Sequence, residues 1–339
     1  MGLFNEHAHY SPIFSSLFII IMVESQNINS SASSPFPGYS EYQKACCGQI
    51  ELPKIDSIFW GHWEVSLAMP IIVSLLSIGS YLYIILLIVP NLAKLGIYVG
   101  ILGFFFLFLF LLTYFQTIYF GPGYFPFYWD WMVQGILPSQ NVDDKILFDM
   151  YSGIITTPEQ YYWAHSLSRP GRSVLSNSAK RYVLRPDHFC SWVSSWIGKR
   201  NFKFFFLFNL YGVLYLLYIS ISGIVGLINE SPTSLLQVPH LFLSIIGIMF
   251  FGMTINFVTM SYTNAKAGIT SWEKWNDIDF TAFDKGQDKN LEDAFGSSDC
   301  CQILLPIPAW NGISNHELSQ DYQSYDVVKR KKNEQNPSV

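Results

Sequence analysis

The sequence predicts an α-helical membrane protein with four transmembrane helices and a long polar loop between the second and the third. Of its 339 residues only 13% are charged, against about a quarter in an average soluble domain. The apolar residues also gather in blocks: residues 65–129 contain one charge, Lys94, and residues 204–265 contain one, Glu230. Blocks of this length are typical of membrane spans and not of soluble cores.

Four stretches are long enough to cross a bilayer, which needs about 20 apolar residues of helix. They are residues 67–90, 95–119, 204–228 and 238–262. The segment between the second and third stretches holds nine Lys and Arg residues, and the turn between the third and fourth holds none. The positive-inside rule therefore predicts that this segment and both termini are cytosolic. The predicted regions are a cytosolic N-terminal region (1–64), helices 1 and 2 (65–119), a cytosolic loop domain (120–203), helices 3 and 4 (204–262) and a cytosolic C-terminal region (263–339).

The charge pattern points to lipid as the partner of this chain. The net charge is −5, and no basic run is interleaved with aromatic residues. Nucleic-acid binding is therefore not expected. We expect a multi-pass protein of the Golgi, the endoplasmic reticulum or the plasma membrane.

The candidate chemistry lies about a dozen residues before the third span. Five cysteines occur in the chain, and the predicted topology places all of them in the reducing cytosol, which disfavours a disulfide framework. The pairs at 46–47 and 300–301 are interpreted as inert or occasionally lipidated surface thiols. Cys190 differs, because Asp187 and His188 precede it closely. If this segment is extended, side chains 188 and 190 share a face, and a thiol, an imidazole and a carboxylate form a nucleophilic constellation.

These residues and their surroundings resemble the DHHC protein S-acyltransferases, four-span enzymes named for an Asp-His-His-Cys motif in the cytosolic loop. Residues 121–126 resemble the Asp-Pro-Gly box of that family, residues 169–172 and 183–202 its cysteine-rich domain, and residues 270–273 its Thr-Thr-x-Glu motif. Asn290 and the residues after it resemble the C-terminal motif of the family. The resemblance runs from about residue 65 to about residue 310. It implies that the loop is a DHHC-like catalytic domain.

The resemblance implies an activity and a set of site residues. Cys190 would attack the thioester of a long-chain acyl-CoA such as palmitoyl-CoA, His188 would take the thiol proton, and Asp187 would hold the imidazole. The acyl group would then pass to a membrane-proximal cysteine of a protein substrate. Trp192 would lie beside the acyl carbonyl, and Ser271 keeps a hydroxyl that could bond Asp187. Glu273, Asn290 and Asn201 would be structural supports. The cations that could meet CoA phosphates are Arg181, Arg185, Lys199 and Arg200, although charges of the positive-inside kind beside anionic lipid explain them equally well.

The departures from the family concern its two structural zinc ions. Only one of the eight residues at the zinc-ligand positions, His165, could bind zinc, and a structural site needs four nitrogen or sulfur ligands. We therefore expect no zinc and a domain packed by aromatic and aliphatic side chains, with a loosely folded domain as the alternative. The eight positions are Tyr162, His165, Leu175, Ser176, Ala179, Tyr182, Phe189 and Trp196.

Two functions other than an enzyme can be compared with the sequence. A catalytically inactive four-span scaffold or acyl-binding pseudoenzyme is favoured by the lost zinc ligands and disfavoured by the retained Asp187, His188 and Cys190. A channel or transporter lacks support because no ionisable residue lies well inside a predicted span.

Overall fold

The computed structural model describes residues 49–52, 63–123, 147–149, 154–156, 172–175, 182–278, 281 and 283–309. Within these ranges the chain is mostly helical, and three helical segments are long and apolar enough to cross a membrane. They are Ala68–Phe120, Phe202–Asn229 and Gln237–Lys266. Parts of the predicted N-terminal region, of the loop domain and of the C-terminal region lie outside the described residues.

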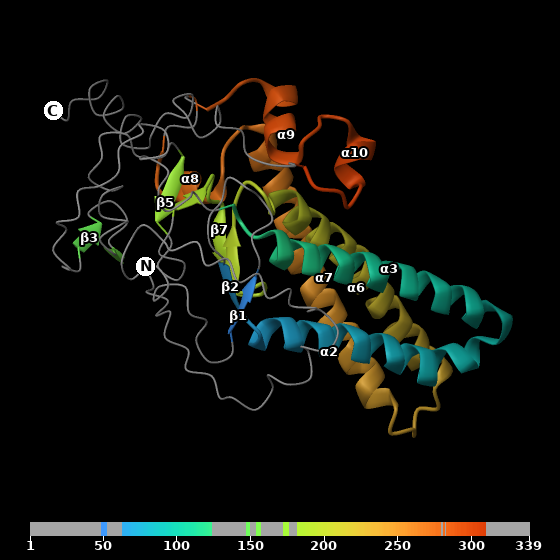
Figure 1. The fold of residues 1–339 in the computed structure, drawn as a ribbon. Coiled ribbons are helices and arrows are strands. Elements are labelled where there is room, and N and C mark those ends of the chain that lie inside the picture. Colours follow the sequence, from blue (N-terminus) through green and yellow to red (C-terminus); the bar gives the residue numbers. More distant parts are fainter. Residues whose placement is uncertain are drawn as a thin grey trace, which may run out of the picture.

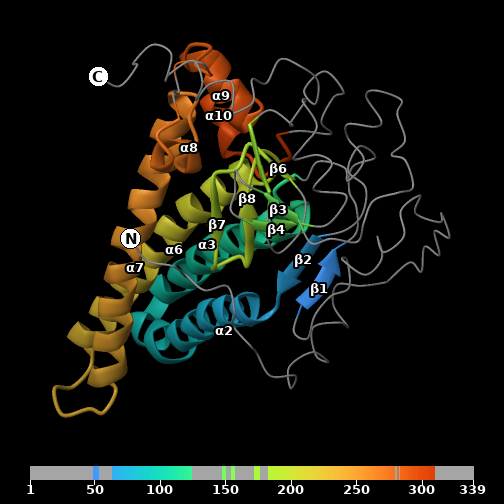
Figure 2. The ribbon, with the colours of Figure 1, turned by 90° about the vertical axis from the view of Figure 1, so that its left-hand side faces the viewer.

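The first segment, Ala68–Phe120, folds back on itself as two antiparallel arms (Figures 1 and 2). The arms are α2 (Ala68–Tyr83) and α3 (Ala93–Phe120), joined by a π-helical turn η2 (Ile84–Ile88) and a 3-10 turn η3 (Val89–Leu92). Pro90 is the second residue of η3, where its missing amide hydrogen removes a helical hydrogen bond. Across the fold, the Tyr81 hydroxyl donates to the Gly100 carbonyl at 3.1 Å. Because the chain stays helical through this reversal, the first two predicted spans form one continuous helical segment.

Helix α6 (Phe202–Asn229) lies between α3 and α7 (Gln237–Lys266), as Figure 2 shows. Its contact with α7 is close because small residues meet there. A methyl group on Gly223 would lie 2.4 Å from the Ser244 hydroxyl, and one on Gly247 would lie 2.4 Å from the Ser220 hydroxyl. Small residues at helix contacts let backbones approach closely, which is how helices associate in lipid.

Short strands and helices gather at one end of the helix bundle (Figure 1). The hairpins are β5–β6 and β7–β8, and all four two-stranded sheets of the described residues are antiparallel. The strands are β1 (Gln49–Leu52), β2 (Trp63–Ser66), β3 (Leu147–Asp149), β4 (Ile154–Thr156), β5 (Ser173–Leu175), β6 (Tyr182–Leu184), β7 (His188–Cys190) and β8 (Ser195–Ile197). Three short helices follow α7: α8 (Ser271–Trp275), α9 (Gln287–Phe295) and α10 (Cys300–Leu304).

The end of α3 fixes these hairpins to the bundle. The helix stops at Gly121, and the carbonyl of Pro122 accepts from the Arg200 amide at 3.2 Å, while the carbonyl of Gly123 accepts from the Leu184 amide at 2.8 Å. A Cβ on Gly198 would lie 2.5 Å from the Pro122 carbonyl oxygen, so only glycine allows this approach. The sequence resemblance at 121–126 therefore includes a segment that joins α3 to both hairpins, although residues 124–126 lie outside the described residues.

The core of this end is aromatic. Phe295 of α9 contacts Phe202 and Phe206 of α6, with ring centroids 5.6 and 5.0 Å apart. Val183 of β6 and Ile197 of β8 are fully buried in the same cluster. The apolar first two turns of α6 thus bind the hairpins and α9 together and set the position of the candidate site.

Candidate active site

Asp187, His188 and Cys190 lie together at the start of the β7–β8 hairpin. The His188 Nδ1 donates to Oδ2 of Asp187 at 2.7 Å, and the Cys190 side chain lies near enough to the same ring to raise its pKa. The Asp187 side chain is almost fully buried, the His188 side chain is 15% exposed and Cys190 is buried. The alternation of a strand therefore brings residues 188 and 190 to one face, as the sequence predicts. A carboxylate, an imidazole and a thiol in this order are able to act as an acid–base relay that ends at the thiol.

The proton affinity of His188 follows from this arrangement. Burial alone lowers the pKa of His188, but the hydrogen bonds with Asp187 and Cys190 and the negative charge at both positions outweigh burial and raise the pKa to about 10. The imidazole therefore holds a proton at neutral pH in the resting arrangement. Its edge also packs on the Phe205 ring of α6, with centroids 4.9 Å apart.

The other oxygen of Asp187 is held by the segment after α7. Oδ1 accepts from the Ser271 main-chain amide at 2.9 Å. The sequence suggested the Ser271 hydroxyl for this contact. The structure uses the amide, and the hydroxyl instead accepts from Asn264 Nδ2 at 3.2 Å. Asn264, near the end of α7, is a residue that the sequence analysis missed, because a single polar residue at the end of an apolar run is no signal.

Glu273 supports the amide that holds Asp187. Its carboxylate accepts from the Thr270 amide at 2.8 Å, while the Thr270 hydroxyl accepts from the Glu273 amide, which is a capping box at the start of α8. Glu273 is fully buried, and its carboxylate also accepts hydrogen bonds from Nε and Nη2 of Arg172, both at 2.8 Å. The Arg172 guanidinium lies 4.2 Å from the Phe283 ring centroid. Arg172 is a second supporting residue that was not predicted from the sequence.

Trp192 follows Cys190 in the turn between β7 and β8. Its carbonyl accepts from the Tyr114 hydroxyl of α3 at 2.8 Å, and its ring meets the Phe250 ring of α7 edge-on at 5.8 Å. Tyr114 is completely buried in the cluster that contains Cys190. Its role could not be predicted from the sequence, because Tyr114 lies inside an apolar span, where tyrosine is a common residue.

The two predicted structural asparagines are both buried and hydrogen-bonded. Asn290 donates to the Lys266 carbonyl at 3.0 Å and to Asp284 at 2.7 Å, which ties α9 to the end of α7. Asn201 donates to the Thr117 carbonyl of α3 at 3.1 Å and to the Trp196 carbonyl of β8 at 3.0 Å. Asn201 therefore connects the hairpin that contains Cys190 to a helix of the bundle.

Two of the cations that could meet CoA phosphates are engaged with a carboxylate. Arg185 donates to Oδ2 of Asp293 at 2.9 Å, and Lys199 Nζ lies 3.3 Å from Oδ1. Burial alone would raise the pKa of Asp293, but these two charges hold it well below its usual range. A phosphate at these cations would have to compete with Asp293. Arg200 is buried, and Arg181 lies outside the described residues.

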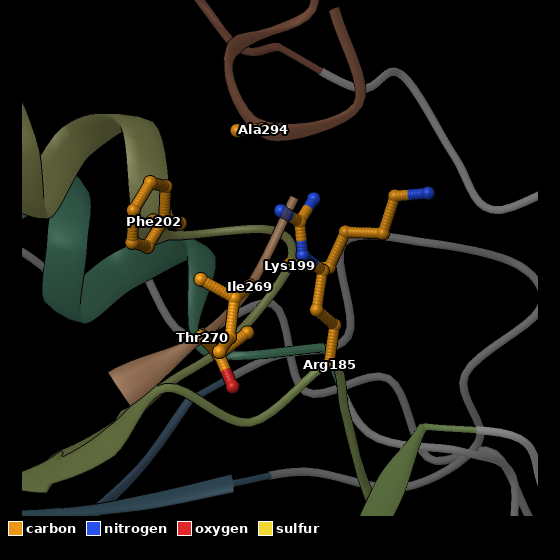
Figure 3. A pocket seen from close by; sticks show the side chains of 7 residues that line it. Arg185, Lys199, Phe202, Ile269, Thr270 and Ala294 are labelled. Atoms are coloured by element: carbon orange, nitrogen blue, oxygen red, sulfur yellow. The ribbon is translucent and has the colours of Figure 1, made fainter. Parts of the chain in front are cut away.

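A small pocket lies beside this ion cluster (Figure 3). It is lined by Arg185, Gly198, Lys199, Phe202, Ile269, Thr270 and Ala294. The pocket lies between the segments on either side of the β7–β8 hairpin, the start of α6, the α7–α8 connection and α9, so it adjoins the residues that support Asp187.

Two of the positions that correspond to zinc ligands in the family are occupied by aromatic rings in mutual contact. Phe189 and Trp196 are cross-strand partners in β7–β8, and their ring centroids lie 6.2 Å apart, edge to face. Neither ring offers a metal a lone pair, since the indole nitrogen is only a donor. Zinc therefore does not fit at this pair. Leu175 and Tyr182 are paired in register in β5–β6, and the other four positions lie outside the described residues.

Comparison with known proteins agrees with this geometry. A family model described as DHHC palmitoyltransferase matches residues 155–278. Palmitoyltransferase ZDHHC9 of Danio rerio is 27% identical over 160 residues, which cover 43% of this chain and 39% of that protein. Palmitoyltransferase ZDHHC15 of Homo sapiens is 31% identical over 140 residues (38% and 42%), and probable protein S-acyltransferase 12 of Arabidopsis thaliana is 28% identical over 159 residues (43% and 53%).

The matched region contains the whole relay and its main supports: Arg172, Asp187, His188, Cys190 and Glu273. The match spans about two fifths to one half of the length of these relatives. The matched region, together with the buried carboxylate, imidazole and thiol that it contains, supports membership of the DHHC-type protein S-acyltransferase family.

Proposed function

We propose that this protein is a protein S-acyltransferase that moves a long-chain acyl group, such as palmitoyl, from acyl-CoA to cysteines of protein substrates through Cys190. The observation that carries the proposal is the buried contact of Asp187, His188 and Cys190 at the end of the helix bundle. A scaffold freed from catalysis would have no need for a histidine held between a carboxylate and a thiol. The similarity to proteins named palmitoyltransferases supports the same conclusion.

The proposed reaction exchanges one thioester for another. With the Cys190 proton held on His188, Sγ attacks the acyl-CoA carbonyl carbon, whose π electrons move to its oxygen. When the carbonyl re-forms, the bond to the CoA sulfur breaks, and CoA leaves as its thiol with the proton from His188. Attack by a substrate cysteine repeats the sequence and frees Cys190. Asp187 keeps the imidazole oriented and stabilises its charge in each half-reaction.

The proposed topology has four spans, with α2 and α3 as the first two. The reversal between Tyr83 and Ala93 supports this reading, because a continuous helix of 53 residues would be about 80 Å long, far more than a bilayer needs. We place the loop domain (120–203), the N-terminal region (1–64) and the C-terminal region (263–339) on the cytosolic side, where acyl-CoA is available. The membrane would be that of the Golgi, the endoplasmic reticulum or the cell surface.

A direct test is incubation of the detergent-purified full chain with palmitoyl-CoA, followed by intact mass measurement. We expect a gain of one palmitoyl group that hydroxylamine removes and that Cys190→Ser abolishes. The double variant Cys300→Ser/Cys301→Ser is the matched control, because both of these thiols are exposed, and it should keep the adduct. A folded protein that gains no acyl group would instead support the inactive scaffold.

We also propose that the loop domain folds without zinc. The support for this is the Phe189–Trp196 pair, which places apolar surface where the family has ligands. Metal analysis of purified protein should give far less than one zinc per chain, and a chelator should leave the unfolding temperature unchanged. Near-stoichiometric zinc, or unfolding on chelation, would contradict the proposal.

A further inference from the structure

Directly across the hairpin from the nucleophile lies a buried hydroxyl group that has no hydrogen-bond partner. Ser195 of β8 is 3% exposed, and its Oγ is one of three buried side-chain oxygen or nitrogen atoms in the described part of the chain that lack a partner. Buried hydroxyl groups are normally hydrogen-bonded, and leaving one unpaired costs folding free energy. Alanine at this position would avoid that cost. An unpaired buried donor next to a reacting group therefore calls for a functional explanation.

The strand register places this hydroxyl beside Cys190. Cys190 and Ser195 are directly opposite in the antiparallel pair, as are Phe189 and Trp196. Opposite residues project from the same face with their Cβ atoms about 5 Å apart. Phe189, 40% exposed, and the half-buried Trp196 form the outer face, while Cys190 and Ser195 are buried on the inner face. The hydroxyl and the thiol therefore enter the same buried space.

The neighbouring polar groups already have partners. His188 is bound to Asp187 and Cys190, and the Tyr114 hydroxyl donates to the Trp192 carbonyl. During acyl transfer, negative charge develops on the thioester oxygen, one bond away from the carbon that Cys190 Sγ attacks. A donor aimed at that oxygen contributes most when water is excluded and the donor is fixed beforehand. Of the groups around Cys190, Ser195 has a hydrogen to donate and no competing acceptor.

We propose that the Ser195 hydroxyl donates a hydrogen bond to the thioester oxygen when it becomes an oxyanion at Cys190, which makes Ser195 a further catalytic residue. The proposal rests on the proposed acyltransferase function. Ser195 keeps its proton throughout: the attacking electron pair comes from Sγ, the carbonyl electrons move to oxygen, and the leaving CoA sulfur takes its proton from His188. The same contact would serve both half-reactions, since each passes through an oxyanion at this carbon.

The test measures the rate of Cys190 palmitoylation in single-turnover experiments on the full chain. Ser195→Ala should slow acylation by about 10²-fold, the loss typical of removing one oxyanion donor. Ser195→Thr and Ser195→Val form a matched pair, because threonine and valine have nearly the same shape and only threonine has a hydroxyl. Acylation should therefore be slow in the valine variant and not in the threonine variant. Ser191→Ala, an exposed serine next to the nucleophile, should leave the rate unchanged.

Alkylation of Cys190 by iodoacetamide distinguishes stabilisation of the oxyanion by Ser195 from an effect of Ser195 on the reactivity of the thiol. That reaction displaces iodide and forms no oxyanion, so its rate and pH dependence should be the same in Ser195→Ala and in the unaltered protein. The unfolding temperature of Ser195→Ala should not fall, because the lost hydroxyl was unpaired.

Equal acylation rates for the threonine and valine variants would overturn the proposal, as would an alkylation rate that falls together with acylation. If the unaltered protein forms no Cys190 adduct, the proposed function itself fails. If it does form one and Ser195→Ala forms it equally fast, only this inference fails.

Discussion

Replacing Asp187 by asparagine is expected to slow formation of the acyl-enzyme by about 10⁴-fold, the loss seen when the carboxylate of a comparable relay becomes an amide. Both carboxylate oxygens are used as acceptors: Oδ2 by His188 Nδ1 and Oδ1 by the Ser271 amide. Asparagine offers one acceptor and one donor. If its NH₂ faces His188, the ring must keep its proton on the nitrogen that faces Cys190, and it can no longer accept the thiol proton. If its NH₂ faces Ser271, two donors meet in a buried space.

The measurement is single-turnover palmitoylation of Cys190 by intact mass, with Asp288→Asn as the control. Asp288 is exposed at the start of α9, so the same chemical change there should leave the rate within a factor of two or so, as for surface substitutions in general. A loss smaller than about tenfold for Asp187→Asn would show that the carboxylate does not orient the imidazole.

The same substitution should have a stability effect that depends on pH. The folded-state pKa of His188 is about 10, above its ordinary value of 6.5. Its charged form is therefore stabilised by folding, and this stabilisation is complete below pH 6.5 and is lost as the pH rises through 10. In Asp187→Asn the hydrogen bond to a carboxylate and its charge are gone, so burial lowers the pKa. The gap in unfolding temperature between the two proteins should be widest below pH 6.5 and should narrow by pH 10. A difference in unfolding temperature that does not change with pH would contradict the explanation that Asp187 raises the pKa of His188.

Breaking the Arg172–Glu273 pair is expected to lower the free energy of unfolding by about 3–5 kcal/mol, since it leaves one buried charge without its counterion. The two side chains are 1% and 0% exposed and form two 2.8 Å hydrogen bonds. Arg172→Met and Glu273→Gln should both show the loss in thermal or denaturant unfolding of the purified chain. Acylation should fall as well, because Glu273 caps the helix whose first amide holds Asp187.

Two further variants test whether the loss of stability comes from breaking the Arg172–Glu273 pair. Lys274→Met removes a positive charge from an exposed position of the same short helix and should change stability by no more than about 0.5 kcal/mol. The double variant Arg172→Met/Glu273→Leu removes both charges and should recover part of the loss, because apolar replacements of buried pairs are often tolerated. Recovery should stay incomplete, since the Thr270 amide also depends on Glu273. A loss below 1 kcal/mol in either single variant would refute the predicted role of the pair.

The sequence predicted the local features of this protein well. Hydropathy located the apolar helices, and the ends of α6 and α7 lie within a few residues of the predicted 204–228 and 238–262. Strand alternation placed His188 and Cys190 on one face. Both predictions depend on periodicities of a few residues, which a single sequence shows directly. The first apolar stretch was less well predicted, because regular α-helix ends at Tyr83 and two other helical turns follow.

The contacts that the sequence did not reveal join distant positions. Arg172 meets Glu273 101 residues later, and Arg185 meets Asp293 108 residues later. The sequence shows four cations near the motif and does not show that a carboxylate on α9 engages two of them. Ser195 was missed for a related reason: its burial opposite Cys190 follows from the hairpin turn, and no residue pattern identifies that turn. Contacts between residues that are far apart in the chain cannot be predicted from a single sequence without an alignment.

The β7–β8 hairpin that contains Cys190 touches three different helices of the bundle: Tyr114 of α3 donates to the Trp192 carbonyl, Phe250 of α7 packs on the Trp192 ring, and Phe205 of α6 packs on His188. If these helices span the membrane as proposed, their tilt follows the thickness of the surrounding lipid. A thicker or thinner bilayer would then shift the three supports by unequal amounts and alter the fit of the thiol to its imidazole. The lipid would act as a mechanical component of the catalytic centre, in addition to being the place where its substrates are found.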